Sequence, residues 1–220
     1  MAHANADRPS WFQHHFTSPV QQFESAKLGM WLFLAQEVLF FAGLFVAYGV
    51  VRVAYPEAFA AGAAQLDWVM GGLNTIVLLF SSLTAALAVR YAQLGDRKMV
   101  STMLYVTIAC AFGFLIIKFF EYSAKFEHGL LPGVHWHPHL AHATELLPAR
   151  THVFFGIYFL LTGLHGVHVI IGIGVLAWIA VRNNRGEFSS EYWTPVDLAA
   201  LYWHLVDLVW IFLFPLLYLI

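Results

Sequence analysis

The chain has 220 residues, of which 60% are hydrophobic and only 11% are charged, and its mean hydropathy is +0.68. Soluble domains carry about 25% charged residues, so this composition predicts an integral membrane protein with almost no chain left for a separate soluble domain. The formal net charge of −2 argues against nucleic-acid binding. The single cysteine, Cys110, excludes an internal disulfide framework.

Five long apolar segments follow a polar amino-terminal tail and predict an all-α integral membrane bundle of five transmembrane helices. We expect a polar cytoplasmic tail over residues 1–24 and a transmembrane domain over residues 25–220. The helices are expected at about 25–51, 67–90, 99–122, 152–181 and 196–220. The third helix ends near Lys118 and Glu121, whose charges we expect to reach the membrane interface.

Basic residues on the two sides of the bundle predict its orientation. With the N-terminus inside, the inner segments hold Arg8, Lys27, Arg90, Arg97, Lys98, Arg182 and Arg185, and the outer segments hold Arg52, Lys118, Lys125 and Arg150. Seven against four favours an inside N-terminus and an outside C-terminus. The outer segment 52–66 is expected to be a loop, because Pro56 and Gly62 interrupt its periodicity.

Ionisable residues lie deep inside three of the apolar segments. Glu37 is roughly 15 Å into the first one, where a carboxylate must find a partner, face water or stay protonated. The last two segments carry His165 with His168 and His204 with Asp207, each pair spaced three residues apart on one helix face. We expect all five side chains to form one buried polar network. In that network Asp207 would bond His204, and Glu37 would pair with an imidazole of the fourth helix.

Three interpretations of this network remain open. The first is a structural network that locks the helices together. The second is a site that handles protons or binds a ligand, and the third is a haem or metal site. A haem site would need His165 or His168 to face His204 from the neighbouring helix. We see no zinc-type spacing with cysteines, and we expect no metal in this chain.

Histidines also gather outside the expected membrane segments. Two groups stand out: His3, His14 and His15 in the tail, and His135, His137 and His139 in the long loop 123–151. Imidazoles titrate near neutral pH, so the tail group is a candidate proton-collecting antenna, with a solvated tail as the simpler interpretation. The loop group is a candidate docking surface for a partner subunit, with a weak metal site as the alternative.

Motifs on all five segments point to one family. They read KLGMWLFLAQEVLFFAGLFVAY, GLNTIVLLFSSLT, FFEY, FFGIYFLLTGLHGVHVIIG and YWHLVDLVWIFLFPLLYL in chain order. Together they resemble subunit III of the haem-copper oxidases, the cytochrome c oxidase family. In this resemblance Glu37 falls on the family's membrane-embedded glutamate, His165 and His168 take its two histidine positions, and Glu121–Tyr122 is the family pair.

The resemblance implies a five-helix form of a non-redox accessory subunit in an aerobic respiratory terminal oxidase. Its partners would be oxidase subunits I and II, which hold the haems and copper of this proton-pumping translocase. The chain would then have no cofactor or catalytic centre of its own, and would buttress subunit I while supporting proton uptake and endurance. Arg182 would lie near the headgroup of a bound phospholipid, a position that also suits anionic lipid on physical grounds. The expected location is the bacterial inner membrane.

Other functions fit parts of the sequence. An equivalent subunit of a quinol oxidase, or an accessory protein of nitric oxide reductase, would have nearly the same fold and motifs. An independent proton-coupled transporter using Glu37 is a third possibility, although five helices without an internal repeat lack the symmetry typical of alternating access. A free-standing b-type cytochrome is a fourth.

Overall fold

The computed structural model describes residues 11–133, 136, 147–148 and 150–220. Within these ranges the chain forms six α-helices and no strand beyond isolated bridges: α1 (Pro19–Ala54), α2 (Pro56–Ala63), α3 (Trp68–Leu94), α4 (Arg97–Glu127), α5 (Thr151–Asn184) and α6 (Thr194–Tyr218). All of them except α2 are long and apolar enough to cross a membrane. The predicted all-α class with five membrane-spanning helices is confirmed.

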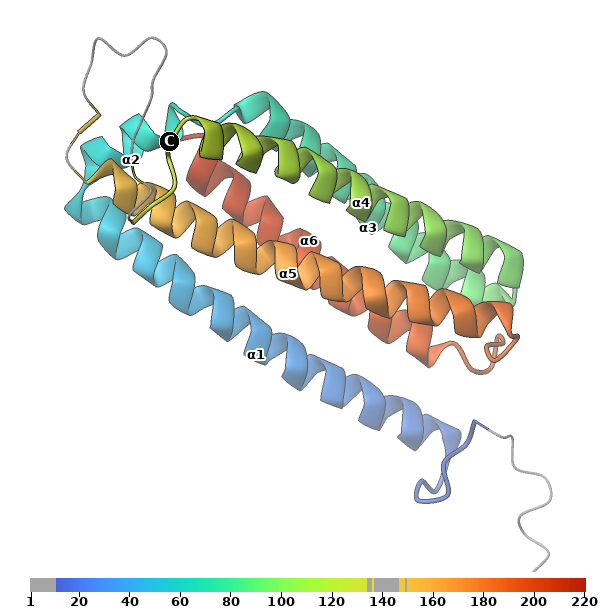
Figure 1. Cartoon of the computed structure of the whole chain (residues 1–220). Helices are drawn as coiled ribbons and strands as arrows, with labels where there is room; N and C mark the ends of the chain where they lie inside the picture. Colours follow the sequence, from blue (N-terminus) through green and yellow to red (C-terminus); the bar gives the residue numbers. More distant parts are fainter. Residues whose placement is uncertain (1–10, 134–135, 137–146, 149) are drawn as a thin grey trace, which may run out of the picture.

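Helices α3, α4, α5 and α6 pack side by side as a bundle, and α1 runs along one side of it (Figure 1). The gap between α1 and the bundle is wider toward the start of α1. The C-terminus and the start of α1 lie at opposite ends of the bundle, as an odd number of spans requires (Figure 1). The α3–α6 bundle therefore forms the core, and α1 is the helix that is least enclosed by the others.

Polar caps set the ends of several helices. Ser18 accepts a hydrogen bond from the backbone N–H of Gln21, and Pro19 occupies the first turn of α1. This cap explains why α1 begins at residue 19, six residues before the predicted start. Asp96 caps α4 in the same way, directly after Gly95, which ends α3 in the left-handed conformation.

The short helix α2 lies in the segment that was expected to be a loop. Pro56 begins it, because a proline without an N–H is tolerated in a first helical turn. Its Gly62 packs against α5 so closely that a Cβ there would lie 2.3 Å from the ring of Phe154. The expectation of a loop over residues 52–66 was wrong. Pro56 begins a helix here, and Gly62 lets that helix pack closely against α5.

Small residues allow the core helices to approach closely. Ala85 and Ala88 of α3 and Ala111 of α4 are fully buried, and the hydroxyls of Thr84 and Thr107 are 2.7 Å apart between the same two helices. This tight packing fixes the depth at which each polar side chain of α3 and α4 lies.

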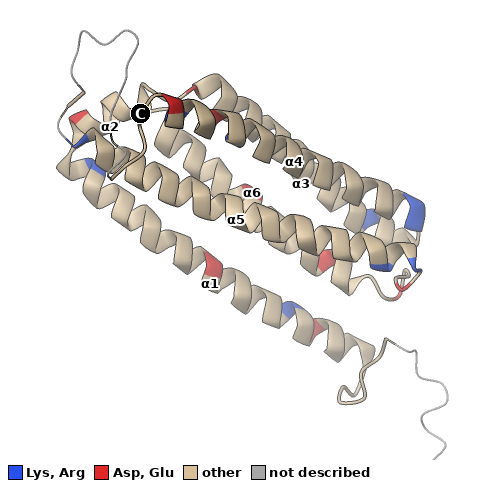
Figure 2. Cartoon of the chain, viewed as in Figure 1, with Lys and Arg blue, Asp and Glu red and all other residues tan. Residues whose placement is uncertain are grey.

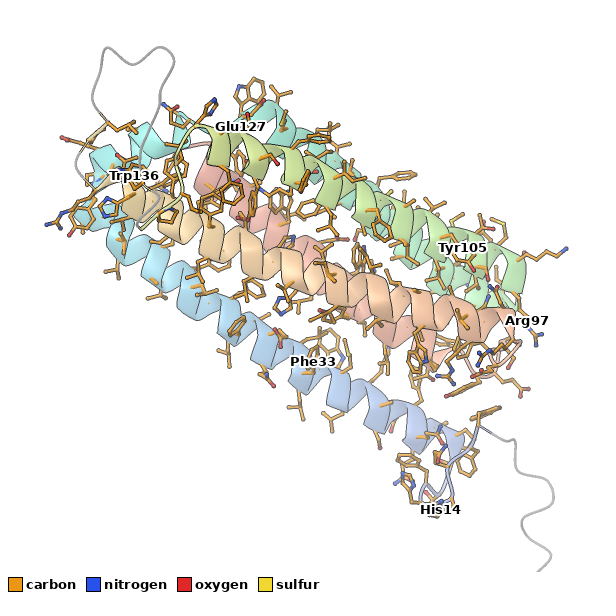
Figure 3. The ribbon with its side chains drawn as sticks, in the orientation of Figure 1. His14, Phe33, Arg97, Tyr105, Glu127 and Trp136 are labelled. Carbon is orange, nitrogen blue, oxygen red and sulfur yellow. The ribbon has the colours of Figure 1, made fainter. Side chains whose placement is uncertain are left out.

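Basic residues gather at the end of the bundle where α3 joins α4 and where α5 ends (Figure 2). Arg97 lies at this end, and so does His14, just before the start of α1. Glu127 and Trp136 lie at the other end (Figure 3). The tail thus shares its side of the bundle with the most basic turn, which is the arrangement that the orientation argument assumed.

Candidate functional site

Glu37 and His168 form an ion pair across the interface between α1 and α5. Glu37 Oε2 and His168 Nε2 are 3.1 Å apart, and both side chains are largely buried near the middle of their helices. The other ring nitrogen, Nδ1, donates to the carbonyl oxygen of Leu164 at 2.8 Å, because a carbonyl can only accept. The pair therefore holds one proton between Oε2 and Nε2, either on the carboxyl group or on the imidazole.

His165 is fully buried and lies on another side of α5. Its ring contacts those of Phe114 and Trp210 at centroid distances of 5.4 and 5.3 Å. Neither ring nitrogen has a hydrogen-bonding partner among the described residues, and the same holds for both side-chain polar atoms of the buried Asn74. His165 is thus held by aromatic packing, and the structure does not join it to the Glu37–His168 pair.

The expected bond between Asp207 and His204 is not present. His204 Nδ1 is instead 2.7 Å from the Ser82 hydroxyl of α3. Asp207 is buried, and its carboxyl group lies beside the hydroxyls of Ser81 and Ser82 on α3. The i, i+3 spacing places both residues on one side of α6, but Ser82 of α3 takes the imidazole of His204. The five predicted residues therefore do not form one network. Glu37 and His168 are bonded to each other, whereas His165 stands apart and His204 bonds to Ser82.

A second buried ion pair, between Lys118 and Glu121, was expected to lie at the membrane interface. The Lys118 Nζ atom donates to Glu121 Oε2 at 3.0 Å, to Tyr158 Oη at 3.0 Å and to Tyr218 Oη at 2.9 Å. Both tyrosines donate in turn to Glu121 Oε1, at 2.8 and 2.6 Å. Every proton of the ammonium group is used, so the cluster joins α4, α5 and α6 with no unpaired charge.

That expectation was wrong because α4 continues to Glu127, about 13 Å beyond Lys118 at ~1.5 Å per residue. Both charged side chains are buried, with exposed fractions of 8% and 2%. The sequence did contain a signal for this cluster. A lysine three residues before a glutamate, in an otherwise apolar run, is spaced to form a pair on one helix face.

An open cavity of about 690 Å³ lies between the first half of α1, the second half of α5 and the first part of α6. Most of its lining is apolar, and Phe33 points into the gap from α1 (Figure 3). Arg182 lies at one end, with its guanidinium over the rings of Trp178 and Phe188 and its Nε 2.6 Å from Glu187 Oε2. An apolar groove with one cation at its rim is suited to an amphipathic molecule.

The two histidine groups outside the spans are only partly described. His14 and His15 are exposed, with ring centroids 5.4 Å apart, whereas His3 lies outside the described residues. His135, His137 and His139 also lie outside the described residues. Nearby, Trp136 packs against His152 and Phe155 at the start of α5.

Two of the histidines that a haem site would use have ring nitrogens that are already bonded. Both ring nitrogens of His168 are already bonded, and His204 faces a serine of α3. Within the described ranges no three histidine, cysteine, aspartate or glutamate side chains cluster as a metal site. What the arrangement can do chemically is hold helices together and share one proton between Glu37 and His168.

The fold and these contacts define a class of protein: a helical membrane protein of five spans whose buried ion pairs tie one span to the next. The family model for cytochrome c oxidase subunit III matches residues 5–128 and 147–220. The chain belongs to the cytochrome c oxidase subunit III family, as its motifs predicted, and membership implies oxidase partner subunits. The gap in the match covers most of the histidine-rich loop.

Several relatives support this assignment. Proteins named cytochrome c oxidase subunit 3 from Oncorhynchus mykiss and Gadus morhua are each 35% identical over 218 residues, covering 96% of this chain and 75% of theirs. The corresponding protein of Salmo salar is 34% identical over the same share of both chains.

Proposed function

We propose that this chain is a non-redox accessory subunit of an aerobic haem-copper terminal oxidase. It buttresses subunit I and supports proton uptake and endurance during turnover, while the haems and copper lie in subunits I and II. The observation that carries the proposal is how the deep polar groups are used. Glu37 with His168 joins α1 to α5, and Lys118 with Glu121 joins α4 to α5 and α6. Such links favour a rigid scaffold over a redox site.

The proposed location is the bacterial inner membrane, with the N-terminus inside and the C-terminus outside. The basic turn between α3 and α4 lies at the same end as the tail, which supports this orientation under the positive-inside rule (Figure 2). The exposed His14 and His15 would then lie on the proton-uptake side. We propose that with His3 they act as a proton-collecting antenna, and that His135, His137 and His139 dock on a partner subunit outside.

A bound phospholipid is the proposed occupant of the cavity beside α1. Its acyl chains would lie against the apolar lining, and its phosphate would meet Arg182 at the rim. Arg182 is held over two aromatic rings, so its guanidinium is already positioned when the lipid arrives.

Replacing Arg182 should release this lipid. We expect Arg182→Gln to lower the tightly bound phospholipid by about one molecule per chain, because the phosphate loses Arg182, the cation that lines the cavity among the described residues. The measurement is lipid phosphorus in the complex purified through detergent washes. Arg185→Gln is the matched control, since Arg185 lies at the same helix end but does not line the cavity. Equal lipid loss in both variants would contradict the site.

Removing the chain tests the function as a whole. We expect the oxidase without it to start at a similar rate at pH 6, to start more slowly at pH 8 and to inactivate faster at both. The redox centres lie elsewhere in the proposed complex, whereas protons are scarce at pH 8 and their supply depends on the inner surface. The measurement is oxygen consumption followed through many turnovers.

A reconstitution control separates the two proposed roles. Adding back the chain with His3, His14 and His15 replaced by Gln should restore endurance but leave the pH 8 rate low. Immediate and total loss of activity at both pH values on removal, with subunits I and II and their cofactors intact, would show that the chain takes part in the chemistry.

A further inference from the structure

A partly exposed polar pair lies on the outer surface formed by α3 and α6. His204 and Ser82 are both partly exposed, and each is near the middle of its helix. His204 Nδ1 is bonded to the Ser82 hydroxyl at 2.7 Å. Its Nε2 has no hydrogen-bonding partner among the described residues. It is also not one of the fully buried polar atoms that lack a partner. This nitrogen can therefore be reached from outside the chain.

Apolar side chains surround the pair at helical spacing. Leu79 lies one turn from Ser82 and is 50% exposed, while Leu208 and Ile211 follow His204 by one and two turns and are 47% and 40% exposed. We call the surface formed by these five residues the α3–α6 face. It is an apolar strip with one hydrogen-bonding group at its centre.

Other exposed surfaces of the bundle differ from this face. The outward side of α4 presents large apolar side chains over a similar depth, including Phe112, Ile116 and Phe120. At mid-depth on the α1 side, Glu37 and His168 satisfy one another. A surface like that of α4 suits lipid chains, whereas lipid offers nothing to His204 Nε2 at the bilayer centre.

We propose that the α3–α6 face is the docking surface for a transmembrane helix of a partner protein that presents a hydrogen-bonding side chain to His204 Nε2. The inference rests on the proposed function, since it identifies which face of the chain meets the rest of the oxidase. The apolar strip supplies packing on both sides of the bond, and the bond fixes the depth of the partner helix. Bonds of this kind between membrane helices set register as well as adding affinity.

Two variants of the pair separate docking from folding. Asn reproduces the position of imidazole Nδ1 and keeps the bond to Ser82, but it does not reach the position of Nε2. We expect His204→Asn to leave the chain folded and to weaken its retention in the complex about threefold to tenfold, the range for one interhelical bond in a membrane. Ser82→Ala removes the internal bond but keeps Nε2, so retention should stay near that of the unmodified chain.

Retention is measured as haem recovered with a tagged chain over increasing detergent concentration, and helix content by circular dichroism shows that each variant folds. Retention that is unchanged in His204→Asn, or lost equally in both variants, overturns the proposal. A chain that never recovers haem, even unmodified, contradicts the proposed function instead.

Photo-cross-linking identifies the occupant directly. A photoreactive phenylalanine analogue at Leu208 should link the chain to another integral membrane protein of the complex, and the same analogue at Phe120 should give only lipid adducts. Adducts from Leu208 to lipid alone, or to a second copy of this chain, overturn the proposal. A protein adduct from Phe120 but not from Leu208 overturns the choice of face while leaving the accessory function standing.

Discussion

Lys118→Met is expected to lower the free energy of unfolding by about 3 kcal/mol, the low end of the cost of breaking a buried ion pair. The loss arises because Glu121 stays buried after its cation is removed. Tyr158 and Tyr218 still donate to Glu121 Oε1, which is why we expect the low end of that range. Methionine matches the length of the lysine stem, so the substitution opens little space among the surrounding rings.

A double variant separates the charge from the packing. In Lys118→Met/Glu121→Gln the neutral amide oxygen can still accept from both tyrosines, so at least half of the lost stability should return. The measurement is unfolding of the full chain in mixed micelles at increasing denaturing detergent. A double variant less stable than Lys118→Met would mean that the ammonium group acts chiefly by filling space.

The hydropathy of the sequence was enough to predict the five membrane-spanning helices, because a buried backbone in lipid must bond to itself. The sequence places Glu37 and the histidines of α5 at a similar depth in the membrane, and this was enough to predict that Glu37 meets an imidazole of α5. Depth did not decide between His165 and His168, since three residues separate them by less than one helical turn. The choice depends on which side of α5 faces α1, and that depends on packing across the bundle.

Errors in the sequence prediction came from helix ends and from competition for polar partners. Placing the end of α4 at residue 122 put Lys118 and Glu121 near water, whereas five further residues of helix put them in the core. The bond expected between Asp207 and His204 overlooked Ser82, which reaches the imidazole from another helix. The eight residues of α2 are too few to give a periodic signal.

The link between α1 and the bundle is the second place where one side chain should have a large effect. Near its ends α1 is tied by the Lys27–Asp197 salt bridge at 3.1 Å and by a hydrogen bond from Tyr48 to the carbonyl oxygen of Leu216. Between them, Glu37 with His168 is the one ion pair that the described residues place at mid-depth on α1. The cavity beside the first half of α1 leaves little other packing there.

Glu37→Ala should therefore cost about 1–2 kcal/mol and let the middle of α1 move away from α5, since His168 Nε2 loses its partner in a largely buried site. Glu37→Gln should keep the helix in place, because the pair shares a single proton and the Gln amide can donate to a neutral Nε2. Spin labels at the exposed Leu39 and Ile170 report the distance between the two helices, which should lengthen and broaden in Glu37→Ala only. Lys27→Met is the matched control, because its more exposed bridge should matter less. If Glu37→Gln broadens the distance as much as Glu37→Ala does, then a full negative charge, and not a hydrogen bond, holds α1 against the bundle.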